Sequence, residues 1–178
     1  MLDRIYQHFT SHVAVVESLS QQAERMLEAA QRCSTALAAG NKVLLCGNGG
    51  SAADAQHIAA ELIGRFIYDR RSLPAVALTT DTSALTAIAN DYGYEQVFSR
   101  QIEGLAVPGD VLIAISTSGN SANVNRAAGS ARERQCEVIG LSGKSGGALA
   151  ALCDTALVGP SDVTATCPPF PPLRQLRQ

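Results

Sequence analysis

Residues 42–51 read Lys42-Val-Leu-Leu-Cys-Gly-Asn-Gly-Gly-Ser51, a short apolar run that passes directly into a glycine-rich turn. Apolar runs of this length are typical of strands that are buried on both faces of a parallel sheet. The residues that follow, from Ala52 to about Gly64, have a helical pattern. The order of strand, glycine turn and helix predicts the first unit of an α/β fold.

The same order recurs along the rest of the chain. Further strands are expected at 75–78, 111–115, 137–141 and 155–158, with helices near 83–89, over 122–135 and after 147. Strands that alternate with helices predict a parallel sheet with right-handed crossovers and helices on both faces. We therefore expect a three-layer α/β sandwich with five parallel strands, in which a ligand binds beyond the carboxyl ends of the strands.

The segment before the first strand, from Leu2 to about Ala39, has apolar residues at helical spacing, and Gly40 follows it as a C-cap glycine would. This pattern predicts one long helix or two shorter ones. The apolar stripe can cover the domain's own sheet or pair with another subunit, and the sequence leaves both arrangements open.

The composition is that of a globular domain. The 178 residues are 46% hydrophobic and 17% charged, with a formal net charge of -2, which gives no electrostatic reason to expect nucleic acid or an anionic membrane as partner. The sequence has no signal-peptide pattern and no apolar run long enough to span a membrane. Five scattered cysteines without a CxxC pair are typical of reduced thiols. We therefore expect a cytoplasmic protein.

Two turns at the ends of expected strands are candidates for anion binding. In the first, Gly47 to Ser51, glycine N–H groups and the following helix N-terminus suit an anion, although a tight turn capped by serine explains the same residues. The second, Ser116-Thr-Ser-Gly-Asn-Ser121, places four hydroxyls and an amide within six residues. Since one hydroxyl is enough to cap a helix, this loop predicts a phosphate site.

Two further pairs of polar residues are candidates for chemistry. His57 and Glu61 lie four apart on the first expected helix and share one face, where they form a base or metal pair or an ordinary polar surface. Asn90 and Asp91 follow the helix after the second strand, where they serve as a polar clamp or as a C-cap and turn. Spacing alone does not separate these alternatives.

Several motifs, taken together and in order, resemble the phosphoheptose isomerases of the sugar isomerase (SIS) domain family. These motifs are Cys-Gly-Asn-Gly-Gly-Ser-Ala at 46–52, Asp54-Ala-Gln-His57, Glu61-Leu62, Ala89-Asn-Asp91 and Ile115-Ser-Thr-Ser-Gly-Asn-Ser-Ala-Asn-Val124. The resemblance runs to about Asp162. It implies a flavodoxin-like SIS fold and an enzyme that interconverts sedoheptulose 7-phosphate and D-glycero-D-manno-heptose 7-phosphate for bacterial surface-sugar synthesis.

The resemblance also implies roles for individual residues. It places the phosphate on Ser116, Thr117, Ser118 and Ser121, and the sugar beside Asn48, Gly49, Gly50, Ser51, Asn90 and Asp91. Glu61 becomes the base, and His57 and Glu61 contribute to a zinc site. Because members of the family are homotetramers with sites between subunits, residues 1–40 are expected to form a helical oligomerisation segment ahead of an SIS domain at 41–160.

The last segment, 161–178, departs from the family pattern. The family continues with a long helix that carries a glutamine and a histidine, which complete the zinc site. Here four prolines, at 168, 169, 171 and 172, forbid a helix. We therefore expect an irregular tail, as from a frame change, with an incomplete zinc site and reduced turnover. Alternatives to the isomerase are a non-catalytic SIS scaffold that binds the replication initiator protein, and a sugar-phosphate sensor.

Overall fold

The computed structural model describes residues 2–65, 69–143 and 145–159. Five parallel strands form one sheet in the order β2-β1-β3-β4-β5. The strands are β1 (Val43–Gly47), β2 (Ala75–Ala77), β3 (Val111–Ser116), β4 (Glu137–Ser142) and β5 (Thr155–Val158). The predicted five-stranded parallel sheet is confirmed, and each expected strand lies within a residue or so of its predicted position.

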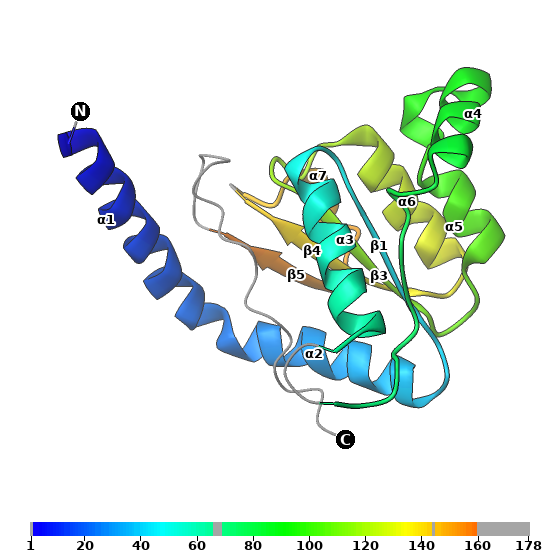
Figure 1. Ribbon diagram of the computed structural model, residues 1–178, viewed down its shortest axis with the longest axis horizontal. Coiled ribbons are helices and arrows are strands. Elements are labelled where there is room, and N and C mark those ends of the chain that lie inside the picture. Colours follow the sequence, from blue (N-terminus) through cyan, green and yellow to red (C-terminus); the bar gives the residue numbers. More distant parts are fainter. Residues whose placement is uncertain (1, 66–68, 144, 160–178) are drawn as a thin grey trace.

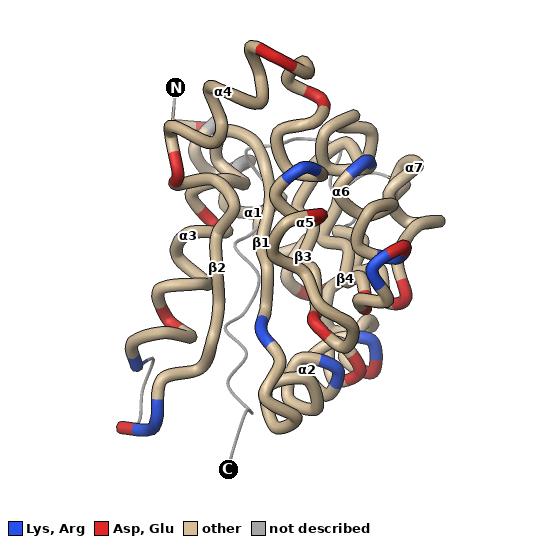
Figure 2. Tube along the Cα trace, turned by 90° about the vertical axis from the view of Figure 1, so that its right-hand side faces the viewer, with Lys and Arg blue, Asp and Glu red and all other residues tan. Residues whose placement is uncertain are grey.

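The middle strands are buried on both faces, as their apolar runs predict. Every residue of β1 and β3 is buried. Because successive side chains point to opposite faces, Val43 and Leu45 join the core on one side of the sheet, and Leu44 and Cys46 join the core on the other. Figure 2 shows strands almost without Lys, Arg, Asp or Glu. Among the described residues, the only charged one within a strand is Glu137 at the start of β4.

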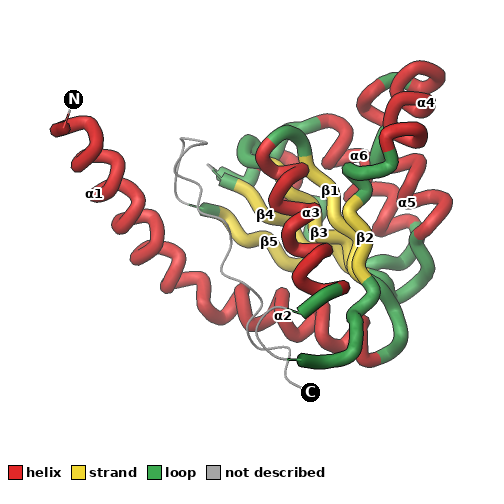
Figure 3. Tube along the Cα trace, in the orientation of Figure 1, coloured by secondary structure: helices red, strands yellow, loops and turns green. Residues whose placement is uncertain are grey.

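Helices cover both faces of the sheet (Figures 1 and 3). One face packs against α2 (Ala23–Ala38) and α3 (Gly50–Ile63). The other packs against α4 (Thr82–Tyr92), α5 (Ser99–Leu105), α6 (Ala122–Glu133) and α7 (Gly147–Ala150). The sequence did not predict α5, because its seven residues are too few to show a helical period. Its Ile102 is nevertheless fully buried.

The N-terminal segment forms two helices, α1 (Leu2–Leu19) and α2, joined by a 3₁₀ turn at Ser20–Gln22. The two helices play different parts. Cys33 and Leu37 of α2 are buried in the core, whereas α1 extends away from the domain (Figures 1 and 3). Apolar residues of α1, including Phe9 and Val13, are 67% and 55% exposed. The stripe of α2 therefore packs on the sheet, whereas much of the stripe of α1 is exposed, apart from the buried Val15 and Leu19 near its end.

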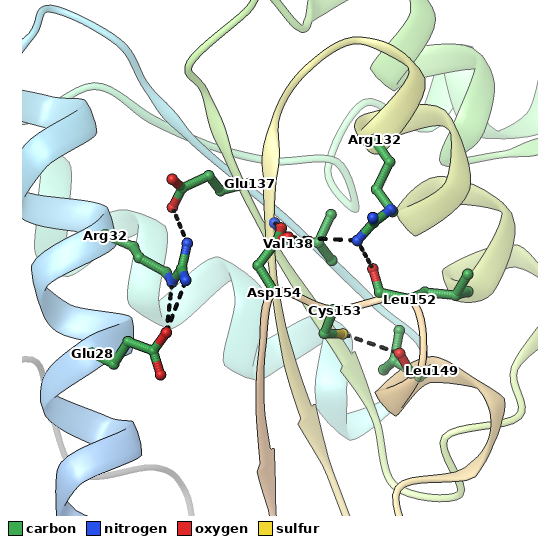
Figure 4. Close-up of polar contacts among 9 residues, drawn as sticks. All are labelled: Glu28, Arg32, Arg132, Glu137, Val138, Leu149, Leu152, Cys153 and Asp154. Atoms are coloured by element: carbon green, nitrogen blue, oxygen red, sulfur yellow. Dashed lines mark hydrogen bonds and ion pairs between the residues drawn. The ribbon is translucent and has the colours of Figure 1, made fainter.

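Charged contacts hold the amino-terminal end of the sheet. The buried Asp110 carboxylate, just before β3, accepts hydrogen bonds from the Lys42 side chain and from the N–H groups of Lys42 and Val107. Burial raises the pKa of Asp110, but these hydrogen bonds outweigh it and lower the pKa overall. Figure 4 shows two further groups here. Arg32 of α2 bridges Glu28 and Glu137, and Arg132 of α6 pairs with Asp154.

Two predictions concern the remainder of the chain. The irregular tail at 161–178 lies outside the described residues. Within the described ranges, no helix is both long enough and apolar enough to cross a bilayer.

Candidate functional site

A pocket lies where β1 and β3 end. The two strands are neighbours in register, with Gly47 opposite Ile115, so the loops that follow them meet at the carboxyl edge of the sheet. The pocket has a volume of about 190 Å³ and is lined by Asn48, Ser51, Ile115, Ser116, Thr117, Ser118 and Ser121. The structure thus brings together the glycine loop (47–51) and all four hydroxyls of the expected phosphate loop (116–121).

The phosphate loop presents hydroxyls at the amino end of α6. Ser121 is the N-cap residue of α6, but its side chain makes no capping hydrogen bond. Its Oγ lies 2.9 Å from Oγ of Ser116 instead, so both hydroxyls are held at the pocket. The first N–H groups of a helix also need acceptors, and the helix dipole favours negative charge there. This arrangement suits a phosphate group.

The shape of this loop depends on close backbone packing at Gly119. Its φ is +66°, and a Cβ built there would lie 1.9 Å from the Gly146 carbonyl oxygen. The Gly119 carbonyl accepts a hydrogen bond from the Leu149 N–H, and the Asn120 side chain accepts one from the Ala148 N–H. The turn after β4 therefore fixes the loop from behind, and only glycine fits at position 119.

The glycine loop needs its glycines for the turn from β1 into α3. Gly49 has a φ of +56°, and a Cβ at Gly47 would lie 2.7 Å from the Ser51 carbonyl oxygen. The helix begins at Gly50, two residues before the predicted start. Gly49 and Gly50 are exposed beside the pocket, whereas Asn48 and Ser51 line it.

The Asn48 side chain is held by residues that the sequence analysis did not select. Its Nδ2 donates to Asn123 Oδ1 at 2.9 Å, and its Oδ1 accepts from Asn123 Nδ2 at 2.8 Å and from the Tyr94 hydroxyl at 3.3 Å. Asn123 is 4% exposed. In the sequence it is one polar residue in the first turn of a helix, and nothing local indicates a partner so far away in the chain.

The pair on α3 faces outward. His57 Nε2 lies 3.9 Å from Glu61 Oε1, with side chains that are 73% and 33% exposed. Neither residue lines the pocket. Structural zinc takes four ligands and catalytic zinc at least three from the protein, and no cluster of three His, Cys, Asp or Glu residues occurs in the described part of the chain. The described residues therefore do not by themselves make up a zinc site.

Asn90 and Asp91 lie in the last turn of α4. Both are exposed, and the Asn90 side-chain amide donates to the Asp91 carboxylate at 2.7 Å. They are not among the residues that line the pocket. Within a single chain, the structure does not bring this pair to the phosphate loop.

Comparison with known proteins agrees with this geometry. The SIS domain family model matches residues 7–143. The phosphoheptose isomerase of Nitratiruptor sp. is 56% identical over 165 residues, which cover 92% of this chain and 88% of that protein. The chain belongs to the phosphoheptose isomerase family.

Solved structures of the family superpose closely on this chain. The phosphoheptose isomerase from Neisseria gonorrhoeae has a TM-score of 0.88 and 47% identity, and that from Francisella tularensis has a TM-score of 0.90 and 38% identity. Each match covers 93% of this chain and 89% of the other. The Vibrio vulnificus NanR protein, at 21% identity and a TM-score of 0.61, shares the fold alone.

Proposed function

We propose that this chain is a phosphoheptose isomerase, which interconverts sedoheptulose 7-phosphate and D-glycero-D-manno-heptose 7-phosphate for bacterial surface-polysaccharide synthesis. The observation that supports this most strongly is the hydroxyl-lined pocket at the amino end of α6, in a chain of this family. A phosphate there is held by Ser116, Thr117, Ser118 and Ser121, and the sugar extends past Asn48.

The reaction moves a proton between C1 and C2 of the sugar. A carboxylate placed over these carbons takes the proton from one and returns it to the other through an enediol-like intermediate, while a second proton passes between the oxygens on C1 and C2. Glu61 is the proposed base. The pocket residues contribute by binding the phosphate, which holds the reacting carbons at a set distance from the loop.

The position of Glu61 supports an assembly of several copies. Glu61 lies ten residues beyond Ser51, the pocket residue on α3, which corresponds to about 15 Å of helix. A seven-carbon sugar held by its phosphate in the pocket is shorter than this. We propose that Glu61 of one copy acts on a substrate bound to another, in a homotetramer to which the uncovered apolar residues of α1 contribute. The proposed location is the cytoplasm.

The proposal includes zinc only as a weakly bound ion. His57 and Glu61 supply two donors, which is too few for tight binding. Zinc in a complete site would act as a Lewis acid toward the sugar carbonyl. We expect weak binding and low turnover for this chain.

The test is isomerisation of sedoheptulose 7-phosphate by the purified full chain, with and without added zinc. Glu61→Gln should abolish the turnover but leave the affinity for inorganic phosphate unchanged. Glu103→Gln is the matched control, because Glu103 is an exposed carboxylate on α5 that pairs with Arg100. Turnover that survives in Glu61→Gln refutes Glu61 as the base. Sugar-phosphate binding without any turnover in the wild type leaves a binding protein instead of an enzyme.

A further inference from the structure

Asn123 connects the two halves of the pocket. It lies in the first turn of α6, two residues after Ser121, whereas its partner Asn48 follows β1. The two side chains are 75 residues apart in the sequence and exchange two hydrogen bonds, of 2.9 Å and 2.8 Å. A reciprocal pair of this kind fixes both the distance between the loops and the plane of the Asn48 carboxamide.

A donor outside the pair fixes the orientation of the two carboxamide groups. Oδ1 of Asn123 also accepts a hydrogen bond from the Val124 backbone N–H at 3.0 Å, so an oxygen must occupy that position. The nitrogen of Asn123 therefore faces Asn48, and the oxygen of Asn48 accepts from it. This leaves the Asn48 nitrogen to donate one N–H to Asn123 and the other elsewhere, since an amide nitrogen carries two N–H groups.

Asn123 and Asn48 differ in burial, and therefore in the roles that they can play. Asn123 is 4% exposed and does not line the pocket, whereas Asn48 does. Asn123 can therefore act on a ligand only through Asn48. The Tyr94 hydroxyl donates to the same Asn48 oxygen, at 3.3 Å.

We propose that Asn123 is a positioning residue, which aims the free N–H of Asn48 at a sugar hydroxyl of the bound heptose phosphate. The inference rests on the proposed function, because it needs a sugar next to Asn48. It separates two contributions to affinity. The hydroxyl loop binds the phosphate, and the Asn48–Asn123 pair binds the sugar.

The test is calorimetric binding of sedoheptulose 7-phosphate and of inorganic phosphate to the full chain. We expect Asn123→Ala to lower the affinity for sedoheptulose 7-phosphate about five- to tenfold, which corresponds to one hydrogen bond. The affinity for inorganic phosphate should change less than about twofold. Asn125→Ala is the matched control, because Asn125 lies on the same helix but bonds to the Gly119 carbonyl instead of Asn48. It should leave the ratio of the two affinities unchanged.

A double-mutant cycle separates positioning from general structure. In a chain that already carries Asn48→Ala, the additional change Asn123→Ala should have no further effect on heptose phosphate binding. Additive losses, or an equal loss of phosphate affinity in Asn123→Ala, overturn the inference. If Asn123→Ala does not fold, Asn123→Leu keeps the volume without the hydrogen bonds and serves in its place.

The proposed function has a separate readout in the same experiment. If the wild type binds heptose phosphate no more tightly than inorganic phosphate, the proposed function fails, and this inference fails with it. If the wild type does gain affinity from the sugar but Asn123→Ala retains that gain, only the role of Asn123 is refuted.

Discussion

We expect the substitution Gly119→Ala to destabilise the phosphate loop more than the addition of a methyl group at any other position there. Gly119 has a φ of +66°, a conformation that costs a residue with a Cβ about 1–2 kcal/mol. The added Cβ would also lie 1.9 Å from the Gly146 carbonyl oxygen, which is backbone and cannot rotate away. Relieving such overpacking typically costs about 1–3 kcal/mol more. We expect a loss of about 2–5 kcal/mol in the free energy of unfolding.

The binding of phosphate should suffer as well. An ordinary contact requires about 3.5 Å between the Cβ and this oxygen, so the loop must move by about 1.5 Å. A displacement of this size moves the hydroxyls of Ser118 and Ser121 away from the proposed phosphate position. We expect at least a tenfold loss of phosphate affinity, measured by calorimetry, and a lower urea midpoint.

Gly129→Ala provides the control for this prediction. Gly129 lies in the middle of α6, the helix that begins at the phosphate loop, and a Cβ there meets nothing within 4 Å. Alanine should therefore raise the free energy of unfolding by about 0.5–1 kcal/mol and leave phosphate affinity unchanged. Wild-type phosphate affinity in Gly119→Ala would refute the account of the loop.

Three further substitutions or treatments test other parts of the structure. Asp110→Asn should lower the free energy of unfolding by about 3 kcal/mol at pH 7, because it leaves the Lys42 ammonium without its carboxylate. The pKa of Asp110 is lower in the folded state than in the unfolded state, so this carboxylate stabilises the fold at a pH above its unfolded pKa. The stabilisation is lost as the pH falls through the folded pKa. Urea titrations of the wild type and of Asp110→Asn should therefore converge at acid pH. Ser121→Ala should weaken phosphate binding about tenfold and lower the free energy of unfolding by only about 0.5–1.5 kcal/mol, because this serine makes no capping hydrogen bond and loses only its bond to Ser116. A much larger loss of stability would contradict this. Burial raises the pKa of Cys46 to about 12, so iodoacetamide at pH 8 should modify this thiol only in denaturant, as mass spectrometry can show.

Much of the architecture can be predicted from local sequence. Apolar runs such as Val43 to Cys46 and Val111 to Ile115 identify strands, because a strand buried on both faces must be apolar at every position. Turn glycines and clustered hydroxyls identify the two loops that form the pocket. Adjacent parallel strands end at the same edge of a sheet, so the meeting of these loops also follows from the order of the elements.

Other features depend on contacts between distant parts of the chain. The short helix α5 is helical because tertiary packing buries Ile102, although its sequence shows no period. The difference between α1 and α2 is likewise not visible in their apolar stripes. Only the fold shows that α2 lies on the sheet and that α1 extends beyond it.

The functional site likewise has features that follow from the sequence and features that depend on the fold. The sequence determined which residue types gather at the carboxyl edge, because glycine, serine and threonine in these loops have a local chemical reason to be there. Only the tertiary structure decided that Asn123 would hold Asn48 and that His57 and Glu61 would lie away from the pocket. The physical reason is that a hydrogen bond between residues 75 apart depends on the packing of whole elements, which leaves no trace in the local sequence of either partner.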